Sequence, residues 1–203
     1  GEEWKGKVAF PSPVTSSPGR AFLVASVEYF DQQGDGDPMA WWEDMVDNEA
    51  IITTGWTEAY ETHYTGGYGE YTEGYIGDAW MTVSYCHSPG VEAFYAENYT
   101  HSTSLVLDHA SFHQIEYAGI INGAAQIDGA NQFMEFLLSS EVNINMPENN
   151  LMYSVIEGAD LPETNGYRYH ADLPSAVTTM TYEEIEANMD IWLDAWKSAT
   201  KQA

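Results

Sequence analysis

The stretch KVAFPSPVTSSPGRAFLVASVEYF, residues 7–30, decides the fold. Its beginning, Lys7 to Phe10, has the apolar character of a short strand. The Thr-Ser-Ser-Pro-Gly sequence at 15–19 then opens an apolar stretch that runs to about Phe30. Serine before proline is typical of a helix N-terminus, because the hydroxyl caps free amides and proline suits an early helical position. The stretch therefore predicts a strand followed by a capped helix.

The same order of elements recurs along the first half of the chain. A β-branched segment over 50–54 precedes a helix expected over 57–64, and a strand expected over 80–85 precedes a helix expected over 88–97. A further segment with helical spacing covers 38–48. This alternation of strands and helices predicts an α/β domain with a largely parallel sheet.

The pattern changes after residue 103. Extended segments are expected over 104–108 and 115–121, an amphipathic helix over 130–138, and a strand over 151–156. The last helix is expected from Thr181 onward, with acidic residues at its start and lysines at its end, as the helix dipole favours. A loop rich in Gly, Tyr and Glu is expected over 66–77, and it contains Tyr68, Tyr71 and Tyr75.

The balance of charge excludes several classes of function. The 203 residues include 6 Lys+Arg and 32 Asp+Glu, for a formal net charge of -26. Such a chain has no positive surface for a nucleic-acid backbone or an anionic membrane face. Hydrophobic residues make up 44% and aromatic residues 14%, which excludes a disordered chain. The acidity favours a surface adapted to high salt, and attraction of a cationic ligand is compatible with it.

The cysteine and histidine content limits the covalent and metal chemistry. Cys86 is the single cysteine, which excludes an internal disulfide and a cysteine-rich zinc site. His109 and His113 are four apart but lack an HExxH pattern, and we expect surface histidines there. No run of about 18 apolar residues is present. The start of the chain shows no export signal, so either the protein is cytosolic or its N-terminal end is missing.

Polar and aromatic residues gather where predicted strands end and helices begin. They lie in Thr-Ser-Ser-Pro-Gly at 15–19, in Gly-Trp-Thr at 55–57, and in Ser-Tyr-Cys-His-Ser-Pro at 84–89. Loops beyond the carboxyl ends of parallel strands form the ligand crevice of open α/β sheets. Helix amides and serine hydroxyls suit an anion, and Trp and Tyr suit a flat cationic ring. Cys86 and His87 are neighbours on a predicted strand, so they point to opposite faces and form no dyad.

Five segments together resemble the thiamine-binding proteins of ABC transporters. They are FPSPVTSSPGRAFL (10–23), TTGWTEAY (53–60), TVSYCHSPGVEAFY (82–95), GANQFMEFLLSSEVNINMPENNLMYSV (129–155) and TYEEIEANMDIWLDAWKSA (181–199). The resemblance extends from about Val8 to Trp196, and the composition is similar to a haloarchaeal version. The family has the type II periplasmic-binding-protein fold and is related to iron(III)-binding proteins.

The resemblance implies capture of thiamine, or of a thiamine phosphate, for delivery to an ABC permease in the membrane. It implies no catalytic residue, no metal and no cofactor. The implied contacts to the hydroxyethyl or phosphate end are Ser16, Ser17 and Trp56. The turn from Tyr85 through Cys86 and His87 to Ser88 adds further contacts, and Tyr153 lies by the ring-binding cleft. Two positions depart from the family pattern, since Leu151 and Val91 stand where aromatic residues are common.

The implied architecture is part of a two-lobed protein that closes over its ligand. Residues 5–104 are expected to form an α/β ligand-binding lobe. Residues 105–203 are expected to form a crossover, part of the second lobe and the C-terminal helix. The N-terminal segment of the family, which carries the export signal, is absent from the sequence. We therefore expect a cell-surface or periplasmic protein, anchored to the membrane in its full-length form.

Two alternatives remain open at the level of sequence. Thiaminase I shares the fold implied by the resemblance and uses a cysteine nucleophile, for which Cys86 is the candidate here. The second alternative is a binding protein for another solute, such as iron(III) or a polyamine.

Overall fold

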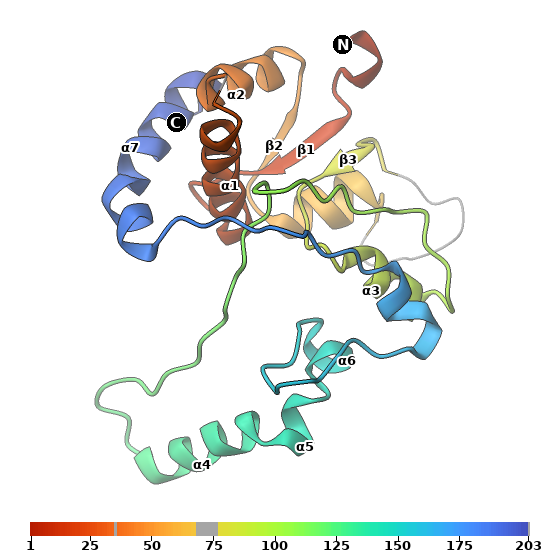
Figure 1. Cartoon of the computed structure of the whole chain (residues 1–203), viewed down its shortest axis with the longest axis vertical. Helices are drawn as coiled ribbons and strands as arrows, with labels where there is room; N and C mark the ends of the chain where they lie inside the picture. The colour runs from red at the N-terminus through yellow and green to blue at the C-terminus, as the bar shows by residue number, and fades with distance from the viewer. Residues whose placement is uncertain (35, 68–76, 203) are drawn as a thin grey trace.

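The computed structural model describes residues 1–34, 36–67 and 77–202. Its sheet consists of three parallel strands in the order β2-β1-β3, with β1 at Val8–Pro11, β2 at Ile51–Thr53 and β3 at Met81–Thr82 (Figure 1). Every residue of β1 is buried, as expected for a central parallel strand covered on both faces. The predicted α/β class is confirmed. Tyr68, Tyr71 and Tyr75 lie outside the described residues.

Two of the predicted helices follow β1 directly. Helix α1 spans Ser17–Gln33 and α2 spans Pro38–Asp47, and both carry proline in the first turn. The Asp37 carboxylate accepts a hydrogen bond from the Met39 amide at 2.8 Å and caps α2. A short 3-10 turn, η1 at Glu2–Trp4, precedes β1. Local capping therefore sets both helix starts. The cap of α1 was predicted from the sequence, whereas the Asp37 cap of α2 was not.

The last helix of the chain returns to the core of the first strands. Helix α7 spans Tyr182–Thr200 and packs against α2. The ring centroids of Trp42 on α2 and Trp196 on α7 lie 5.9 Å apart, edge to face, and both side chains are fully buried. The indole of Trp42 also donates to the Ser26 hydroxyl at 3.1 Å. The remaining buried residues of this cluster are Val8, Phe10, Leu23 and Leu193.

A second pair of elements packs beside the sheet. Helix α3 spans Ser88–Tyr95 and lies against η3, at Thr164–His170. A Cβ at Gly90 would lie 2.3 Å from the Tyr167 carbonyl oxygen, so only glycine permits this close approach. Between β2 and β3, the wide helical turn η2 at Glu58–Tyr64 occupies the predicted helix of that region.

The remaining helices lie apart from the sheet. Figure 1 shows α4 (Ile127–Leu138), α5 (Ser140–Asn143) and α6 (Met146–Asn150) beyond two long connecting segments. No residue of α4 is buried, and even its large apolar side chains Phe133 and Phe136 are exposed. None of the described helices has the length and apolar character of a membrane-spanning segment.

Three predicted extended segments do not form strands. Residues 104–108, 115–121 and 151–156 have no strand assignment among the described residues, and the strand expected over 80–85 is confined to Met81–Thr82. In 151–156 the Asn143 carboxamide oxygen accepts from the Val155 amide at 2.9 Å. This side chain satisfies the Val155 amide, which a neighbouring strand would otherwise bond.

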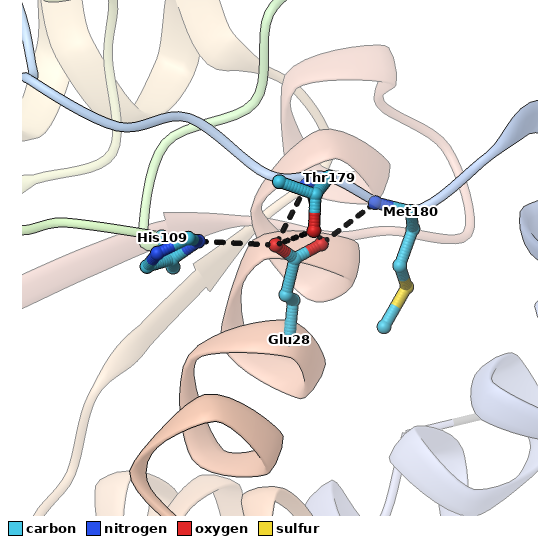
Figure 2. A network of polar contacts seen from close by, with 4 residues as sticks. All are labelled: Glu28, His109, Thr179 and Met180. Carbon is cyan, nitrogen blue, oxygen red and sulfur yellow. Dashed lines mark hydrogen bonds and ion pairs between the residues drawn. The ribbon is translucent and has the colours of Figure 1, made fainter.

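A buried carboxylate holds the two connecting segments against α1. Glu28 accepts hydrogen bonds from the amide and hydroxyl of Thr179, from the Met180 amide and from the His109 ring (Figure 2). The two segments also pair directly, because the His109 amide donates to the Ala176 carbonyl at 3.1 Å. His109 is therefore partly buried and functions in packing, whereas His113 is exposed as expected.

Candidate ligand-binding site

The turn between β1 and α1 is shaped by its serines and its glycine. Ser16 is buried, and its hydroxyl accepts from the Gly19 amide at 3.4 Å, while Ser17 is exposed. A Cβ at Gly19 would lie 2.4 Å from the Pro11 carbonyl oxygen, so the helix starts directly against the end of β1. The N-terminal amides of a 17-residue helix thus face the edge of the sheet where the strand ends.

The turn after β2 contacts this first turn and places Trp56 beside it. The Thr15 hydroxyl donates to the Thr54 carbonyl at 2.6 Å. Trp56 is half-buried, and its ring stacks on Tyr60 with centroids 5.0 Å apart and planes 12° from parallel. The ring of Tyr85 approaches Trp56 edge-on at 5.8 Å. The tryptophan is therefore held between residues of two different turns.

The turn after β3 is joined to Trp56 by a chain of hydroxyl groups. The Trp56 indole donates to the Ser84 hydroxyl at 2.9 Å, and the hydroxyls of Ser84 and Ser88 lie 2.7 Å apart. The Ser88 hydroxyl also accepts from the Tyr85 amide at 3.3 Å. The structure thus brings Trp56, Tyr85 and Ser88 together, as the loop argument from sequence predicted.

His87 connects this cluster to the segment after α6. Its Nε2 lies 2.5 Å from the Leu151 carbonyl oxygen, and its ring meets Tyr153 edge-on at 5.3 Å. Burial lowers the pKa of His87, although its hydrogen bond to Leu151 acts in the opposite direction. The ring is therefore neutral near neutral pH and donates its Nε2 proton to the carbonyl. Burial also raises the pKa of Tyr153 to about 12, so its hydroxyl stays protonated.

Cys86 lies in the same turn, and no cation or histidine of the described residues lowers the pKa of its thiol. Burial raises the pKa of its thiol and outweighs the opposing hydrogen bond with Ser111. The neighbouring His87 ring is engaged with Leu151, which agrees with the sequence argument against a Cys-His pair. A thiol with a raised pKa is a poor nucleophile, because the thiolate is the reactive form.

Three contributors to the site are not among the contacts predicted from sequence, although Ser84 lies in the predicted turn at 84–89. Ser84 links Trp56 to Ser88, and Tyr60 backs the Trp56 ring. Glu92 accepts from the Tyr60 hydroxyl at 2.5 Å. A signal for Glu92 is present in the sequence, since it is the only carboxylate in the stretch SPGVEAFY at 88–95. A carboxylate in an otherwise apolar helical stretch is buried only when it is hydrogen-bonded, so the sequence indicates hydrogen-bonding partners for Glu92.

The predicted residues fall into three groups in space. Trp56, Tyr85 and Ser88 share one cluster, and His87 with Tyr153 extends it toward α6. Ser16 and Ser17 lie in the adjoining turn and directly follow Thr15, which contacts Thr54. Cys86 is in the same turn as Tyr85 and Ser88, and it is partly buried. This arrangement offers helix amides, hydroxyls and aromatic faces, which suit a ligand with a polar end and flat rings.

Comparisons with known proteins agree with this architecture. No family model matches the chain. The thiamine-binding periplasmic protein of Salmonella typhimurium is 25% identical over 198 residues, covering 98% of this chain and 54% of the relative. Those of Escherichia coli and Brucella melitensis are 24% and 26% identical over 201 and 200 residues, covering 99% and 97% of the chain and 55% and 53% of each relative.

A solved periplasmic thiamin binding protein superposes with a TM-score of 0.68 at 21% identity, over 97% of this chain and 55% of that one. The chain has the type II periplasmic-binding-protein fold. It spans about half the length of the curated relatives it matches.

Proposed function

We propose that this chain is part of a thiamine-binding component of an ABC importer that works outside the cytoplasm. The observation that carries the proposal is the cluster of Trp56, Tyr85 and Ser88 beside the amino end of α1. The half-buried indole suits a flat cationic ring, and the hydroxyls and helix amides suit a hydroxyethyl or phosphate group. The names of the relatives, thiamine-binding periplasmic proteins, support the same ligand.

The proposed ligand contacts are the eight residues predicted from sequence. They are Ser16, Ser17, Trp56, Tyr85, Cys86, His87, Ser88 and Tyr153. The proposed role is binding without bond cleavage, followed by delivery to a membrane permease. The raised pKa of Cys86 supports binding over thiamine cleavage, because cleavage through this residue needs a thiolate.

We further propose that the chain supplies one lobe and part of a second. In this proposal residues 5–104, completed by α7, form the ligand-binding lobe, and most of 105–203 forms the crossover and part of the second lobe. The exposed aromatic rings of α4 support a missing neighbour, since Phe133 and Phe136 are 57% and 56% exposed. The neighbour proposed is a preceding segment of the same polypeptide, which also carries the signal and the membrane anchor.

The α4 part of the proposal is tested by hydrogen exchange. Backbone amides of α4 are expected to exchange slowly in the longest natural polypeptide that contains this chain and rapidly in residues 1–203 alone. Equal, rapid exchange in both would leave α4 without the neighbour proposed here. Amides of the buried segment of α1, from Leu23 to Ser26, serve as the internal reference.

The ligand is tested by calorimetric titration of the same natural polypeptide with thiamine, thiamine phosphate, iron(III) and spermidine. Trp56→Ala is expected to weaken thiamine binding at least about tenfold, as loss of a stacking and cation–π contact predicts. Trp80→Ala is the matched control, because Trp80 is 48% exposed and packs against Trp4 instead. A flat thiamine trace with wild-type protein, or equal losses in both variants, would refute the proposal.

The haloarchaeal resemblance is part of the same proposal. The net charge of -26 is screened as ionic strength rises, because the Debye length falls from about 10 Å at 0.1 M to about 3 Å at 1 M. Thermal unfolding in increasing KCl is expected to shift to higher temperature across this range. A melting temperature that stays constant would argue against a high-salt origin.

A further inference from the structure

Glu92 is a buried carboxylate held only by neutral groups among the side-chain partners described for it. The residue is 2% exposed and lies in the middle of α3. It accepts from the hydroxyls of Tyr60 at 2.5 Å, Thr100 at 2.6 Å and Ser102 at 2.7 Å. Within the described residues it forms no ion pair. No cation of the described residues therefore stands next to this carboxylate.

The Glu92 carboxylate lies at the hydroxyl end of Tyr60, the middle ring of a stack of three aromatic rings. Tyr60, whose hydroxyl bonds Glu92, stacks on Trp56 with centroids 5.0 Å apart. Tyr64 stacks on Tyr60 at 5.8 Å, and its hydroxyl donates to Ser102, a second partner of Glu92. The stack therefore runs from a buried negative charge to Trp56, which belongs to the candidate site.

A negative charge in this position acts on whatever contacts Trp56. Charges buried in protein interact over longer distances than charges in water, because the effective dielectric constant is lower. The hydrogen bond from the Tyr60 hydroxyl to the carboxylate also makes the Tyr60 ring more electron-rich. A more electron-rich ring strengthens the attraction of a cation to the stack. A glutamine in this position would have the same shape but no charge, and only its single oxygen could accept from the hydroxyls.

We propose that Glu92 is a specificity-determining residue of the site, selecting a heteroaromatic ligand that carries positive charge over a neutral ring of the same shape. The inference rests on the proposed function and identifies the positive charge of the ring as the ligand property that the site selects. Glu92 touches Tyr60 and acts through the Tyr60–Trp56 stack, so it is a positioning and electrostatic residue that does not contact the ligand.

The test compares thiamine with its neutral isostere, in which a thiophene ring replaces the thiazolium. Both are titrated calorimetrically into the natural polypeptide that contains this chain. In wild-type protein, thiamine is expected to bind more tightly than the isostere. Glu92→Gln is expected to weaken thiamine binding about tenfold and isostere binding less than about twofold. A purely structural role would weaken both ligands equally.

Three further variants separate charge from shape. Glu92→Asp keeps the charge and is expected to retain the preference for thiamine. Tyr60→Phe keeps both rings but breaks the link to the carboxylate, and it is expected to reduce the preference at least about twofold. Thr100→Val removes one hydroxyl donor without removing the charge and is expected to leave the preference unchanged. If Glu92→Gln fails to fold, as judged by circular dichroism, Tyr60→Phe decides the question.

The outcomes separate the two proposals. Wild-type protein that binds neither ligand refutes the proposed function and this inference together. In a second outcome, wild-type protein binds thiamine, but the variants weaken the affinity for both ligands equally or for neither. That outcome refutes only the role of Glu92.

Discussion

The backbone amide of Thr179 lies 2.6 and 2.8 Å from the two carboxylate oxygens of Glu28, although 151 residues separate them in the chain. Glu28 is 1% exposed and lies on α1, the helix that begins at the proposed ligand contacts Ser16 and Ser17. The same helix therefore carries the candidate site at its start and the attachment of the connecting segments further along. Figure 2 shows this attachment.

Removal of the Glu28 carboxylate is expected to destabilise the fold. Glu28→Ala leaves the amides of Thr179 and Met180 without their acceptor, and a loss of about 3 kcal/mol in the free energy of unfolding is expected. Asp31→Asn, on an exposed position of the same helix, is the control and is expected to change stability by less than about 0.5 kcal/mol. Urea unfolding followed by circular dichroism measures both, and equal stability of the two variants would contradict the prediction.

The same carboxylate is expected to make stability depend on pH. Burial raises the pKa of Glu28, but the hydrogen bonds from Thr179, Met180 and His109 outweigh it, so the net pKa lies below its usual value. A lowered folded-state pKa stabilises the fold above the unfolded-state pKa, and this contribution is lost as pH falls through the folded-state value. Unfolding free energies measured from about pH 7 downward are expected to decline below about pH 5. Glu28→Gln should flatten that decline, and an unchanged slope would exclude Glu28 as its source.

Gly19 is expected to tolerate no side chain. In Gly19→Ala the new Cβ would lie 2.4 Å from the Pro11 carbonyl and 2.6 Å from the Ser12 carbonyl, so the start of α1 must shift. A loss of about 2 kcal/mol or more in stability is expected, together with weaker thiamine binding. Gly129→Ala, at an open position in α4, is the matched control and is expected to stabilise by about 0.5–1 kcal/mol. Similar melting temperatures for the two variants would show that the turn is not tightly packed.

Cys86 is expected to react slowly with alkylating reagents. Because burial raises the pKa of its thiol, the thiolate fraction at neutral pH is small. Alkylation by iodoacetamide, followed by mass spectrometry, is expected to be slower than that of free glutathione at pH 7 and to accelerate at higher pH. Since Cys86 is the single cysteine, the assay reports this site alone. Rapid reaction at pH 7, or thiamine turnover that Cys86→Ser abolishes, would favour the thiaminase alternative.

Local signals predicted the starts of the two longest helices, α1 and α7. Ser16 and Pro18 marked the start of α1, and Thr181 with Glu184 marked the start of α7, where both hydrogen bonds of a capping box form. These signals are reliable because capping satisfies free amides with side chains only a few residues away. Strands were less predictable, since the β-branched character of 151–156 did not ensure a neighbouring strand.

Part of the candidate site could likewise be predicted from the sequence, and part of it could not. The placement of Trp56, Tyr85 and Ser88 on turns at one sheet edge followed from parallel topology, which brings the carboxyl ends of strands together. The contributions of Ser84, Tyr60 and Glu92 depend on side-chain contacts between residues up to 32 apart, and those distances are set only when the elements pack.

The sequence by itself determined the alternation of strands and helices in the first half of the chain, the starts of α1 and α7, the anionic surface and the aromatic turns of the candidate site. Each of these follows from residues close together in the chain or from composition. Only the tertiary structure decided that α7 packs on Trp42, that Glu28 holds Thr179, and that Glu92 lies behind the Trp56 stack. Those contacts join residues far apart in the chain, and they depend on which buried surfaces fit together, a property that no local pattern records.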